Sequence, residues 1–583
     1  MAKIFKCLKG REWAFLFVSI ILLIIQVSLD LSIPDYMGEI TQLVQTEGSS
    51  MDEILHAGGI MLACSLGSLV VTIVVTYFSA QIATTVAMRL REQVYDKTIS
   101  FSAADINSFS IASLITRSTN DITQVQNFLA IGYIALVRAP LMAVWAITKI
   151  SAKSSSFTSV TLIFIASLLI VIAILLKASM PKSKRLQTLT DGLNNVAREH
   201  LTGIRVVRAY NAEKYQEDKF ENVNQDITQT NTFINRATGF FAPYMTFLMS
   251  TLTIVIYWVG VYLINDAQGM EKITIFSDMV VFSSYAMQII MAFMMMTMLL
   301  IVTPRTMVVL KRITEVLDFD NSVVEGNKAD VPTANVAIEF KDVCFSYGAS
   351  EENVLDNISF KVNKGETIAF IGATGSGKST ILQLMLRNYD ATSGQILIDG
   401  VDIKEYKQST LQDKFGYIPQ KAVLFTGDVK NNVAYCEKPG LNIDASRVKM
   451  AVQIAQAEDF VDKIGLDGEV SQGGLNLSGG QKQRLSIARA LYKKAPMYLF
   501  DDCFSALDYK TDFNLRDAIA KQLKNTTKVF VAQRISTVKD CNIIVVLDGG
   551  KIVGKGTHRE LLANCKVYQE IVSSQLSSKE AEL

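Results

Sequence analysis

The stretch Gly372-Ala373-Thr374-Gly375-Ser376-Gly377-Lys378-Ser379-Thr380 decides the fold of the C-terminal half of this chain. It follows the apolar residues 367–371, which predict a buried strand, and it precedes residues 381–386, which predict a helix. A glycine-rich loop between a strand and a helix is the context of a phosphate-binding loop. Its glycines let successive backbone N–H groups turn toward one centre, and the helix start adds partial positive charge. The stretch therefore predicts a site for a nucleoside triphosphate.

Two side chains of this loop carry the predicted chemistry. Lys378 would reach the β- and γ-phosphates of ATP, and the Ser379 hydroxyl would ligate Mg²⁺. The rest of the loop would hold the phosphates mainly through backbone N–H groups, and these nucleotide-binding residues are Gly372, Thr374, Gly375, Ser376, Gly377 and Thr380. ATP and Mg²⁺ are therefore the predicted cofactors.

The composition separates the chain into two halves. With 583 residues, the chain is too long for one domain. Up to about residue 303 it carries long apolar runs, whereas the remainder has the charged, turn-rich composition of a soluble α/β domain. A net charge of +1 gives no support for a nucleic-acid partner. The 7 cysteines form no CxxC pair, which favours a reduced cytosolic setting without structural zinc.

Six apolar segments in the N-terminal half are long enough to span a membrane. At about 1.5 Å of rise per residue, each can cross a hydrocarbon core of about 30 Å. They comprise residues 13–33, 54–78, 129–150, 157–176, 240–264 and 276–302. Residues 34–53 contain no Lys or Arg, whereas the second and fourth connections are rich in them, and positive charge marks the cytoplasmic side. The sequence predicts a multi-pass protein of the cytoplasmic membrane, with both termini and the nucleotide-binding half in the cytosol.

The two basic connections are long, and the one between the fourth and fifth spans contains no proline between residues 183 and 235. This favours continuous helices that extend about 40 Å out of the membrane over flexible loops. We expect the tips of these cytosolic arms near residues 117–121 and near residues 209–215.

The sixth apolar segment carries a methionine stripe. Residues Met287, Met291, Met294 and Met298 are spaced i, i+4, i+7, i+11 and so share one helical face. Flexible thioethers suit a surface that accepts many apolar shapes, which makes this face a candidate substrate cavity. Ordinary helix packing and lipid contact remain alternatives.

Two ionisable residues, Asp30 and Arg138, also fall in apolar segments, where charged groups are candidates for a function. We expect Asp30 near the outer end of its helix and Arg138 near the inner interface, with the charged groups extending to the membrane interfaces.

Further motifs in the C-terminal half resemble those of one family. Leu477-Ser478-Gly479-Gly480-Gln481 is similar to the signature of ATP-binding cassette (ABC) proteins, and the apolar residues 497–500 lead into Asp501, as in the family's magnesium-binding strand. With six preceding spans, the whole chain resembles a half-transporter of the ABC exporter type. The resemblance implies a membrane all-α domain of six transmembrane helices with long cytosolic extensions, fused to an α/β P-loop nucleotide-binding domain. We assign residues 1–317 to the former, 338–583 to the latter and the polar residues 318–337 to a linker.

The resemblance also implies roles for single residues. Tyr347 resembles the aromatic residue that stacks on adenine, although a core tyrosine is the alternative. Gln420 resembles the glutamine that contacts Mg²⁺, and Asp501 would hold the Mg²⁺ through water. In the family, two cassettes sandwich two ATP molecules, so the signature residues Ser478, Gly479, Gly480 and Gln481 would contact the nucleotide of the opposite cassette.

Two positions depart from the family pattern. The residue after the strand-ending aspartate is usually a glutamate that polarises the attacking water, and here it is Asp502, a weaker base because its carboxylate is retracted by roughly 1.5 Å. The family also has a switch histidine near the γ-phosphate, where this chain has Gln533, which cannot become a cation. Both residues would act at the chain's own phosphate loop, whereas its signature is intact.

These departures predict the degenerate-site subunit of a heterodimeric bacterial multidrug exporter, in which "degenerate" means poorly hydrolytic. A different half-transporter carrying the consensus glutamate and histidine would be its partner, and the assembled dimer would be the ATP-hydrolysing translocase. Hydrophobic drugs or other amphiphiles are the expected substrates, in contact with membrane lipid. A homodimer with two slow sites is one alternative, and an ATP-gated regulatory or lipid- or peptide-handling half-transporter with little hydrolysis of its own is another. A soluble cassette protein is excluded by the six spans.

Overall fold

The computed structural model describes residues 8–46, 48–153, 155–328, 334–348, 352–437 and 443–575. The chain forms two compact units, one made of Met1–Lys97 with Ala112–Phe319 and the other of Thr98–Ile111 with Asp320–Leu583. We call them the membrane unit and the nucleotide-binding unit. The short segment Thr98–Ile111 comes from between two membrane helices, yet it packs with the nucleotide-binding unit.

The membrane unit is entirely helical, as predicted. Within the described residues, six of its helical stretches are long and apolar enough to cross a membrane, which confirms the six predicted spans. Its α-helices are α2 (Gly10–Gln45), α3 (Met51–Ile99), α5 (Ile111–Thr116), α6 (Ile122–Asn127), α7 (Tyr133–Lys153), α8 (Ser155–Thr202), α9 (Ile204–Ala209), α10 (Glu213–Gly239), α11 (Phe241–Asp266) and α12 (Met270–Leu317), with π-helical turns η1 (Arg117–Asp121) and η2 (Phe128–Gly132).

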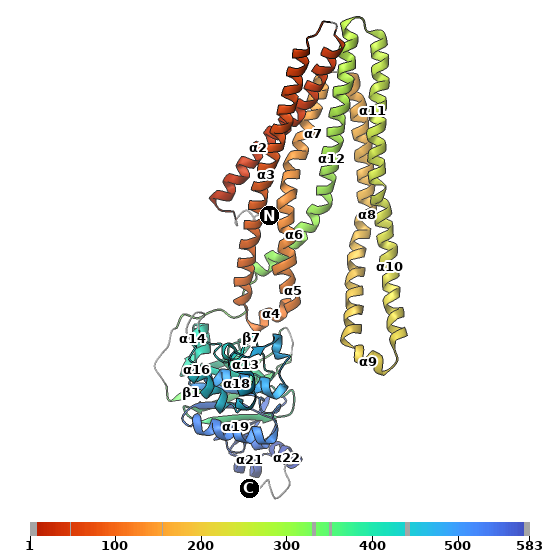
Figure 1. The fold of residues 1–583 in the computed structure, drawn as a ribbon. Coiled ribbons are helices and arrows are strands. Elements are labelled where there is room, and N and C mark those ends of the chain that lie inside the picture. Colours follow the sequence, from red (N-terminus) through yellow and green to blue (C-terminus); the bar gives the residue numbers. More distant parts are fainter. Residues whose placement is uncertain are drawn as a thin grey trace. The chain divides into compact units, whose positions relative to one another are not determined.

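The cytosolic arms are continuous helices, as expected, but only one tip lies where we predicted it. Helices α8 and α10 run side by side and are joined through α9, and the chain reverses at residues 210–212, which confirms the second tip (Figure 1). The first prediction is wrong, because residues 117–121 lie inside the returning helix as η1. The chain instead reverses around α4 (Ala103–Phe109), where Ser102 and Asp105 form a reciprocal capping box that starts a new helix.

The prediction that Asp30 and Arg138 lie at opposite ends of the membrane-spanning region is also wrong. They form an ion pair between α2 and α7, with Arg138 Nη2 2.9 Å from Asp30 Oδ2. The Ser68 hydroxyl donates to Asp30 Oδ1 at 2.5 Å, and Gln288 Nε2 donates to the Asp30 carbonyl at 3.2 Å. In a medium of low dielectric constant, a neighbouring opposite charge stabilises a charged side chain. Asp30 and Arg138 therefore stabilise each other and need not extend to water. The pair and its two polar neighbours link four helices.

The core of the membrane unit is apolar and lies among α2, α7, α8, α11 and α12. Its largest fully buried side chains include Phe157, Phe282 and Tyr285. The Tyr285 hydroxyl donates to the Leu31 carbonyl at 2.9 Å, so its one polar group is satisfied inside the bundle.

The nucleotide-binding unit is an α/β fold, as predicted. Its strands are β1 (Val336–Phe345), β2 (Leu355–Asn363), β3 (Thr367–Gly372), β4 (Ser393–Ile398), β5 (Val401–Asp402), β6 (Phe415–Ile418), β7 (Gly427–Asp428), β8 (Glu469–Val470), β9 (Met497–Asp501), β10 (Thr527–Val531), β11 (Ile543–Asp548) and β12 (Lys551–Gly556). Besides α4, its helices are α13 (Lys378–Met385), α14 (Gln408–Asp413), α15 (Val429–Val433), α16 (Ala445–Ile454), α17 (Glu458–Ile464), α18 (Gly479–Lys493), α19 (Tyr509–Gln522), α20 (Ile535–Val538), α21 (His558–Asn564) and α22 (Lys566–Gln575), with 3-10 turns η3 (Ile403–Glu405) and η4 (Gln472–Gly474).

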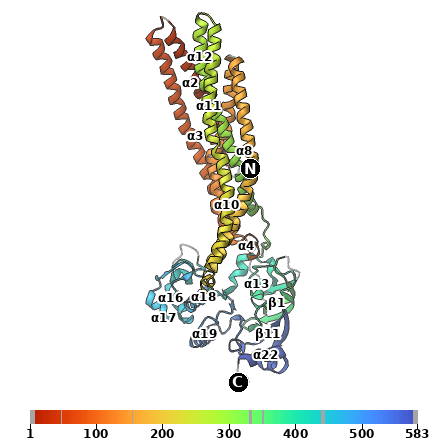
Figure 2. The same ribbon diagram turned by 90° about the vertical axis from the view of Figure 1, so that its right-hand side faces the viewer.

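Two larger sheets organise this unit. The six-stranded sheet has the order β12-β11-β3-β10-β9-β6, in which only β12 is antiparallel to its neighbour. The four-stranded sheet β2-β1-β4-β5 is antiparallel. Figure 2 shows α16, α17 and α18 on one side of the unit and β1 with α13 on the other. Because β3, β10 and β9 are adjacent and parallel, their carboxyl ends lie at one edge, where ligands of such sheets bind.

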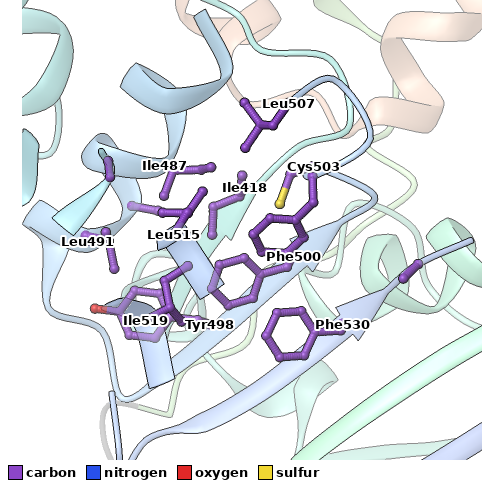
Figure 3. Packing of buried hydrophobic residues seen from close by; sticks show 14 of the residues in the cluster. Ile418, Ile487, Leu491, Tyr498, Phe500, Cys503, Leu507, Leu515, Ile519 and Phe530 are labelled. Carbon is purple, nitrogen blue, oxygen red and sulfur yellow. The ribbon is translucent and has the colours of Figure 1, made fainter. Parts of the chain in front are cut away.

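A buried apolar cluster holds this edge in place. Ile487 and Leu491 of α18 pack with Leu515 and Ile519 of α19 over Phe500 and the neighbouring strands (Figure 3). The rings of Phe500 and Phe530 are stacked with centroids 4.6 Å apart, which ties β9 to β10. Since Phe500 directly precedes Asp501, this packing fixes the position of the acidic residues that follow it.

Candidate functional site

The phosphate-binding loop, residues 372–380, connects β3 to α13 at the carboxyl edge of the six-stranded sheet. Gly375 and Gly377 have φ values of 87° and 91°, a left-handed conformation that favours glycine. A Cβ at Gly377 would also lie 2.6 Å from a methyl group of Leu355. The backbone is thereby held in the predicted cradle, with Ala373, Thr374 and Gly375 exposed.

Lys378 is buried beneath this loop. Its Nζ donates to the carbonyls of Gly372 and Ala373 at 3.0 and 2.7 Å and to Ser376 Oγ at 3.3 Å. Burial lowers the pKa of the Lys378 ammonium group, an effect that the nearby Asp502 and Asp501 oppose. The ammonium group is thus held inside the loop, in a cradle that fits a polyphosphate.

Asp501 and Ser379 form an oxygen-rich pair. Ser379 Oγ donates to Asp501 Oδ1 at 2.6 Å, and the Tyr417 hydroxyl donates to Asp501 Oδ2 at 3.4 Å. Burial raises the pKa of the Asp501 carboxyl, and these two hydrogen bonds oppose that rise. A hydroxyl and a carboxylate side by side are ligands that suit Mg²⁺, so the residues present fit the predicted ion. We did not predict the contact from Tyr417, because this residue lies on β6, 84 positions before Asp501 in the sequence.

Asp502 is held by both glutamines of the predicted site. Gln533 Nε2 donates to Asp502 Oδ2 at 3.0 Å, and Gln420 Nε2 lies 3.3 Å from the same oxygen. The Asp502 backbone is left-handed, with a φ of 43°, and its N–H donates to the Val531 carbonyl at 2.8 Å. Burial raises the pKa of the Asp502 carboxyl, while the hydrogen bond from Gln420 and the charge of Lys378 lower it. The structure therefore brings together Gln420, Asp502 and Gln533, which are far apart in the sequence.

Tyr347 lies at the edge of an aromatic cluster. Its ring packs edge-on against Phe345 and Tyr389, with centroid distances of 4.8 and 5.2 Å, and its hydroxyl is 3.1 Å from Thr380 Oγ1. The side chain remains 41% exposed, so it is not the core tyrosine of the alternative interpretation. A free ring surface beside the phosphate loop suits stacking on a base.

The signature motif caps a helix. Ser478 is the N-cap of α18, with its N–H donating to Gln481 Oε1 at 2.8 Å and its Oγ accepting from the Gln481 N–H at 3.3 Å. Ser478 and Gly479 are exposed, and Leu475 before them is 83% exposed. The start of α18 thus carries partial positive charge on an open surface, as an anion site requires.

Comparison with known proteins decides the family. Residues 16–293 match the ABC transporter transmembrane region, and residues 355–505 match the ABC transporter family. An uncharacterised ABC transporter ATP-binding protein of Mycobacterium tuberculosis is 34% identical over 90% of this chain and 88% of its own length. The chain belongs to the ABC exporter family.

Other relatives of this ABC exporter half-transporter point the same way. The ATP-dependent lipid A-core flippase of Paraburkholderia xenovorans is 30% identical over 87% of this chain and 84% of its own length. The structure of a bacterial Atm1-family ABC exporter with ATP bound has the same fold, with a TM-score of 0.82 over 97% of this chain and 98% of that chain at 22% identity. The half-transporter is a multi-pass membrane protein with a cytosolic nucleotide-binding domain, and its function is ATP-driven transport.

The methionine stripe of the half-transporter does not pack in the core of its membrane unit. The side chains of Met287, Met291, Met294 and Met298 are between 37% and 60% exposed. The opposite face of α12, with Tyr285 and Ile289, is buried among the other helices. Ordinary packing within this unit is therefore excluded for the stripe, whereas lipid contact and a cavity shared with a second chain are both compatible with it.

Within the nucleotide-binding unit, helix α4 packs close to Tyr347. Asn107 Nδ2 donates to the Tyr389 hydroxyl at 3.1 Å, and Tyr389 packs against Tyr347. The buried carboxylate of Asp105 accepts the Ser322 N–H at 3.1 Å, which attaches the same segment to the chain that follows α12. In this ABC exporter, a segment between two membrane helices thus contacts the aromatic cluster beside the phosphate loop. Sequence reasoning missed this contact, because Asn107 and Tyr389 are 282 positions apart in the sequence.

Proposed function

We propose that this half-transporter is the degenerate-site subunit of a heterodimeric exporter. The observation that carries the proposal is Asp502, whose Oδ2 lies within hydrogen-bond distance of both the Gln420 and the Gln533 amides. A general base needs a carboxylate oxygen free to accept from water at about 2.6–3.2 Å. Here the carboxylate is one methylene shorter than that of a glutamate, and one of its oxygens is already engaged. Hydrolysis at this site would therefore be slow.

Gln533 supports the same proposal. Its amide can donate a neutral hydrogen bond, but it cannot carry the positive charge that an imidazolium would place near the γ-phosphate. ATP with Mg²⁺ would still bind, since Lys378, Ser379 and Asp501 have the geometry that such binding needs. The chain's own site would retain ATP rather than turn it over.

The signature of the chain would serve a different site. Ser478 caps α18 and lies exposed, so the start of this helix is available to a nucleotide held by a second cassette. A partner half-transporter with the consensus glutamate and histidine would build a competent site against it. In this arrangement, residues 1–317 form the transmembrane domain, residues 318–337 the linker and residues 338–583 the nucleotide-binding domain.

The proposed substrates are hydrophobic drugs or other amphiphiles. The exposed methionines of α12 offer an adaptable apolar surface, and Gln288 on the same helix contacts the backbone of Asp30, which pairs with Arg138. Apolar and polar groups side by side suit a molecule with an apolar body and a polar head. Relatives named as lipid A-core flippases make a lipid the second candidate substrate.

The test compares the chain alone with the pair. The tagged chain is purified with the half-transporter that accompanies it, and also by itself, and steady ATP hydrolysis is measured in lipid nanodiscs. We expect the pair to hydrolyse ATP and to lose activity by a factor of about 100 or more when the partner's catalytic glutamate becomes glutamine. The chain alone should be nearly inactive.

Steady hydrolysis by the chain alone, at the rate of the pair, would contradict the heterodimer proposal and favour a homodimer. A pair that binds ATP but never hydrolyses it would favour the ATP-gated regulatory alternative. Stimulation of the pair by lipid extracts but not by apolar drugs would favour the lipid substrate.

A further inference from the structure

The carboxamide of Gln575, the last residue of α22, bridges the segment that follows β10. Gln575 Nε2 donates to the Gln533 carbonyl at 2.7 Å, and Gln575 Oε1 accepts the Ile535 N–H at 2.9 Å. One side chain thus spans residues 533–535. This is the backbone that presents the Gln533 amide to Asp502.

The bridge supplies a hydrogen-bond acceptor that the start of helix α20 lacks. The N-terminal N–H groups of a helix lack partners within the helix, and a side chain at the N-cap position usually satisfies one of them. The N-cap of α20 is Arg534, which makes no such hydrogen bond and has no acceptor to offer. Gln575 supplies the missing oxygen from a different helix, so the start of α20 depends on α22.

Helix α22 is itself firmly attached. Tyr568 and Val572 are buried, and the Tyr568 hydroxyl is 2.7 Å from His558 Nδ1 on α21. The helix packs against β3, the strand that leads into the phosphate loop, and against β11. Its last residue is therefore carried by a helix packed on the central sheet, which holds the bridge beside residues 533–535, here called the switch segment.

We propose that Gln575 is a positioning residue for the nucleotide site, acting through Gln533. By holding the Gln533 carbonyl and the start of α20, it aims the Gln533 amide at Asp502 Oδ2. An amide hydrogen bond on that carboxylate reduces the negative potential facing a bound polyphosphate. Loss of the bridge would free the switch segment, expose the Asp502 charge and speed the release of ATP. The inference rests on the part of the proposed function in which this site binds ATP.

The test measures how long the site retains nucleotide. The tagged chain, in its co-purified complex in nanodiscs, is loaded with photoreactive 8-azido-ATP and Mg²⁺ and chased with unlabelled ATP. It is then irradiated at successive times and separated from its partner under denaturing conditions. Gln575→Ala should accelerate loss of label about 3- to 10-fold, the size expected when one hydrogen bond, that from Gln533 to Asp502, is lost. Gln575→Glu keeps an acceptor for Ile535 but loses the donor to Gln533, and should also accelerate release.

Two further variants separate positioning from simple helix packing. Gln569, on the same helix, donates to the Leu562 carbonyl at 2.6 Å on α21, so Gln569→Ala removes a comparable hydrogen bond away from the switch segment and should leave release unchanged. In a Gln533→Ala background, Gln575→Ala should have no further effect, because the amide that it positions is already gone.

The inference would be overturned if Gln575→Ala or Gln575→Glu retained the label as long as the wild type. It would also be overturned if Gln569→Ala accelerated loss of label equally, or if the effects of Gln533→Ala and Gln575→Ala were additive in the double variant. Rapid release by the wild type, accelerated further by Gln575→Ala, would support the positioning role. That result would overturn only the retained-nucleotide part of the proposed function.

Discussion

The phosphate loop and the signature motif use the same physics, a helix N-terminus that offers backbone N–H groups to an anion, yet the chain treats them differently. At the phosphate loop, Lys378 is buried and held by three acceptors of the same loop. The signature makes its capping box and otherwise lies open, with Ser478 and Gly479 exposed. We call the phosphate loop with Asp501, Asp502 and Gln533 the closed site, and the exposed start of α18 the open site.

The two departures from the family pattern both belong to the closed site, and neither affects the signature. Asp502 and Gln533 belong to the closed site, where Gln533 donates a hydrogen bond to Asp502, whereas the signature keeps every residue of its motif. If both sites had lost function by drift, the signature would have had no reason to be spared. The contrast supports the proposal that the chain holds nucleotide at one site and assists hydrolysis at another.

The largest expected effect comes from the open site. Gly480→Asp would place a carboxylate at the start of α18, where it would repel the phosphates of the partner's ATP, and hydrolysis by the pair should fall by about 100-fold or more. The fold should survive, since a Cβ at Gly480 would lie 3.5 Å from its nearest neighbour, the Ala506 carbonyl oxygen. ATPase assays check the loss, and retained 8-azido-ATP labelling of this chain is the control. Undiminished hydrolysis by the Gly480→Asp pair would contradict a role of the open site in hydrolysis.

Lys378→Ala should weaken ATP binding by this chain and leave hydrolysis by the pair nearly unchanged, which is the reverse of Gly480→Asp. Removal of the ammonium group deletes charge-assisted hydrogen bonds to phosphate, each worth about 1.5–3 kcal/mol, so labelling of this chain by 8-azido-ATP should fall at least about 30-fold. Hydrolysis by the pair should stay within about threefold of the wild type, because the competent site uses the partner's phosphate loop. A collapse of hydrolysis as deep as that of Gly480→Asp would show that the two sites are equivalent.

Restoring the family residues should convert the closed site. The double variant Asp502→Glu with Gln533→His extends the carboxylate and supplies an imidazole, and a positioned general base contributes about 10²–10⁴-fold. In a Gly480→Asp background, which silences the other site, we expect hydrolysis to rise about 10-fold or more above that background. Asp502→Glu alone should give less, because Gln533 would still donate to the carboxylate. No gain in the double variant would mean that other residues make the site slow.

The smallest effect concerns the contact between α4 and the aromatic cluster. Tyr389→Phe keeps the ring against Tyr347 but removes the hydroxyl that accepts from Asn107. A single neutral hydrogen bond is worth about 0.5–1.5 kcal/mol, so substrate stimulation of the ATPase should fall about 2- to 5-fold while ATP binding is unchanged. Asn107→Ala, which removes the other partner, should match it. Unequal effects of Tyr389→Phe and Asn107→Ala would show that their hydrogen bond is not what couples α4 to the aromatic cluster.

Much of the site was predictable because its residues follow local rules. Strand, glycine-rich loop and helix occur in one continuous stretch, and the positive φ at Gly375 and Gly377 is what such a loop demands. The Ser102–Asp105 capping box was equally local, and attention to it would have placed the first cytosolic tip correctly. The methionine spacing predicted a shared face but could not reveal whether that face is buried.

By itself, the sequence determined six membrane spans, the phosphate loop, the signature and the two departures, because length, hydropathy and motif spacing are properties of neighbouring residues. Only the tertiary structure decided that Asp30 pairs with Arg138, that Gln420 and Gln533 meet on Asp502, and that Gln575 caps α20. Each of these contacts joins residues on different helices or on loops that follow different strands. Side chains that are distant in the sequence find their partners only when packing brings their elements together, and a buried polar group accepts whichever partner that packing supplies.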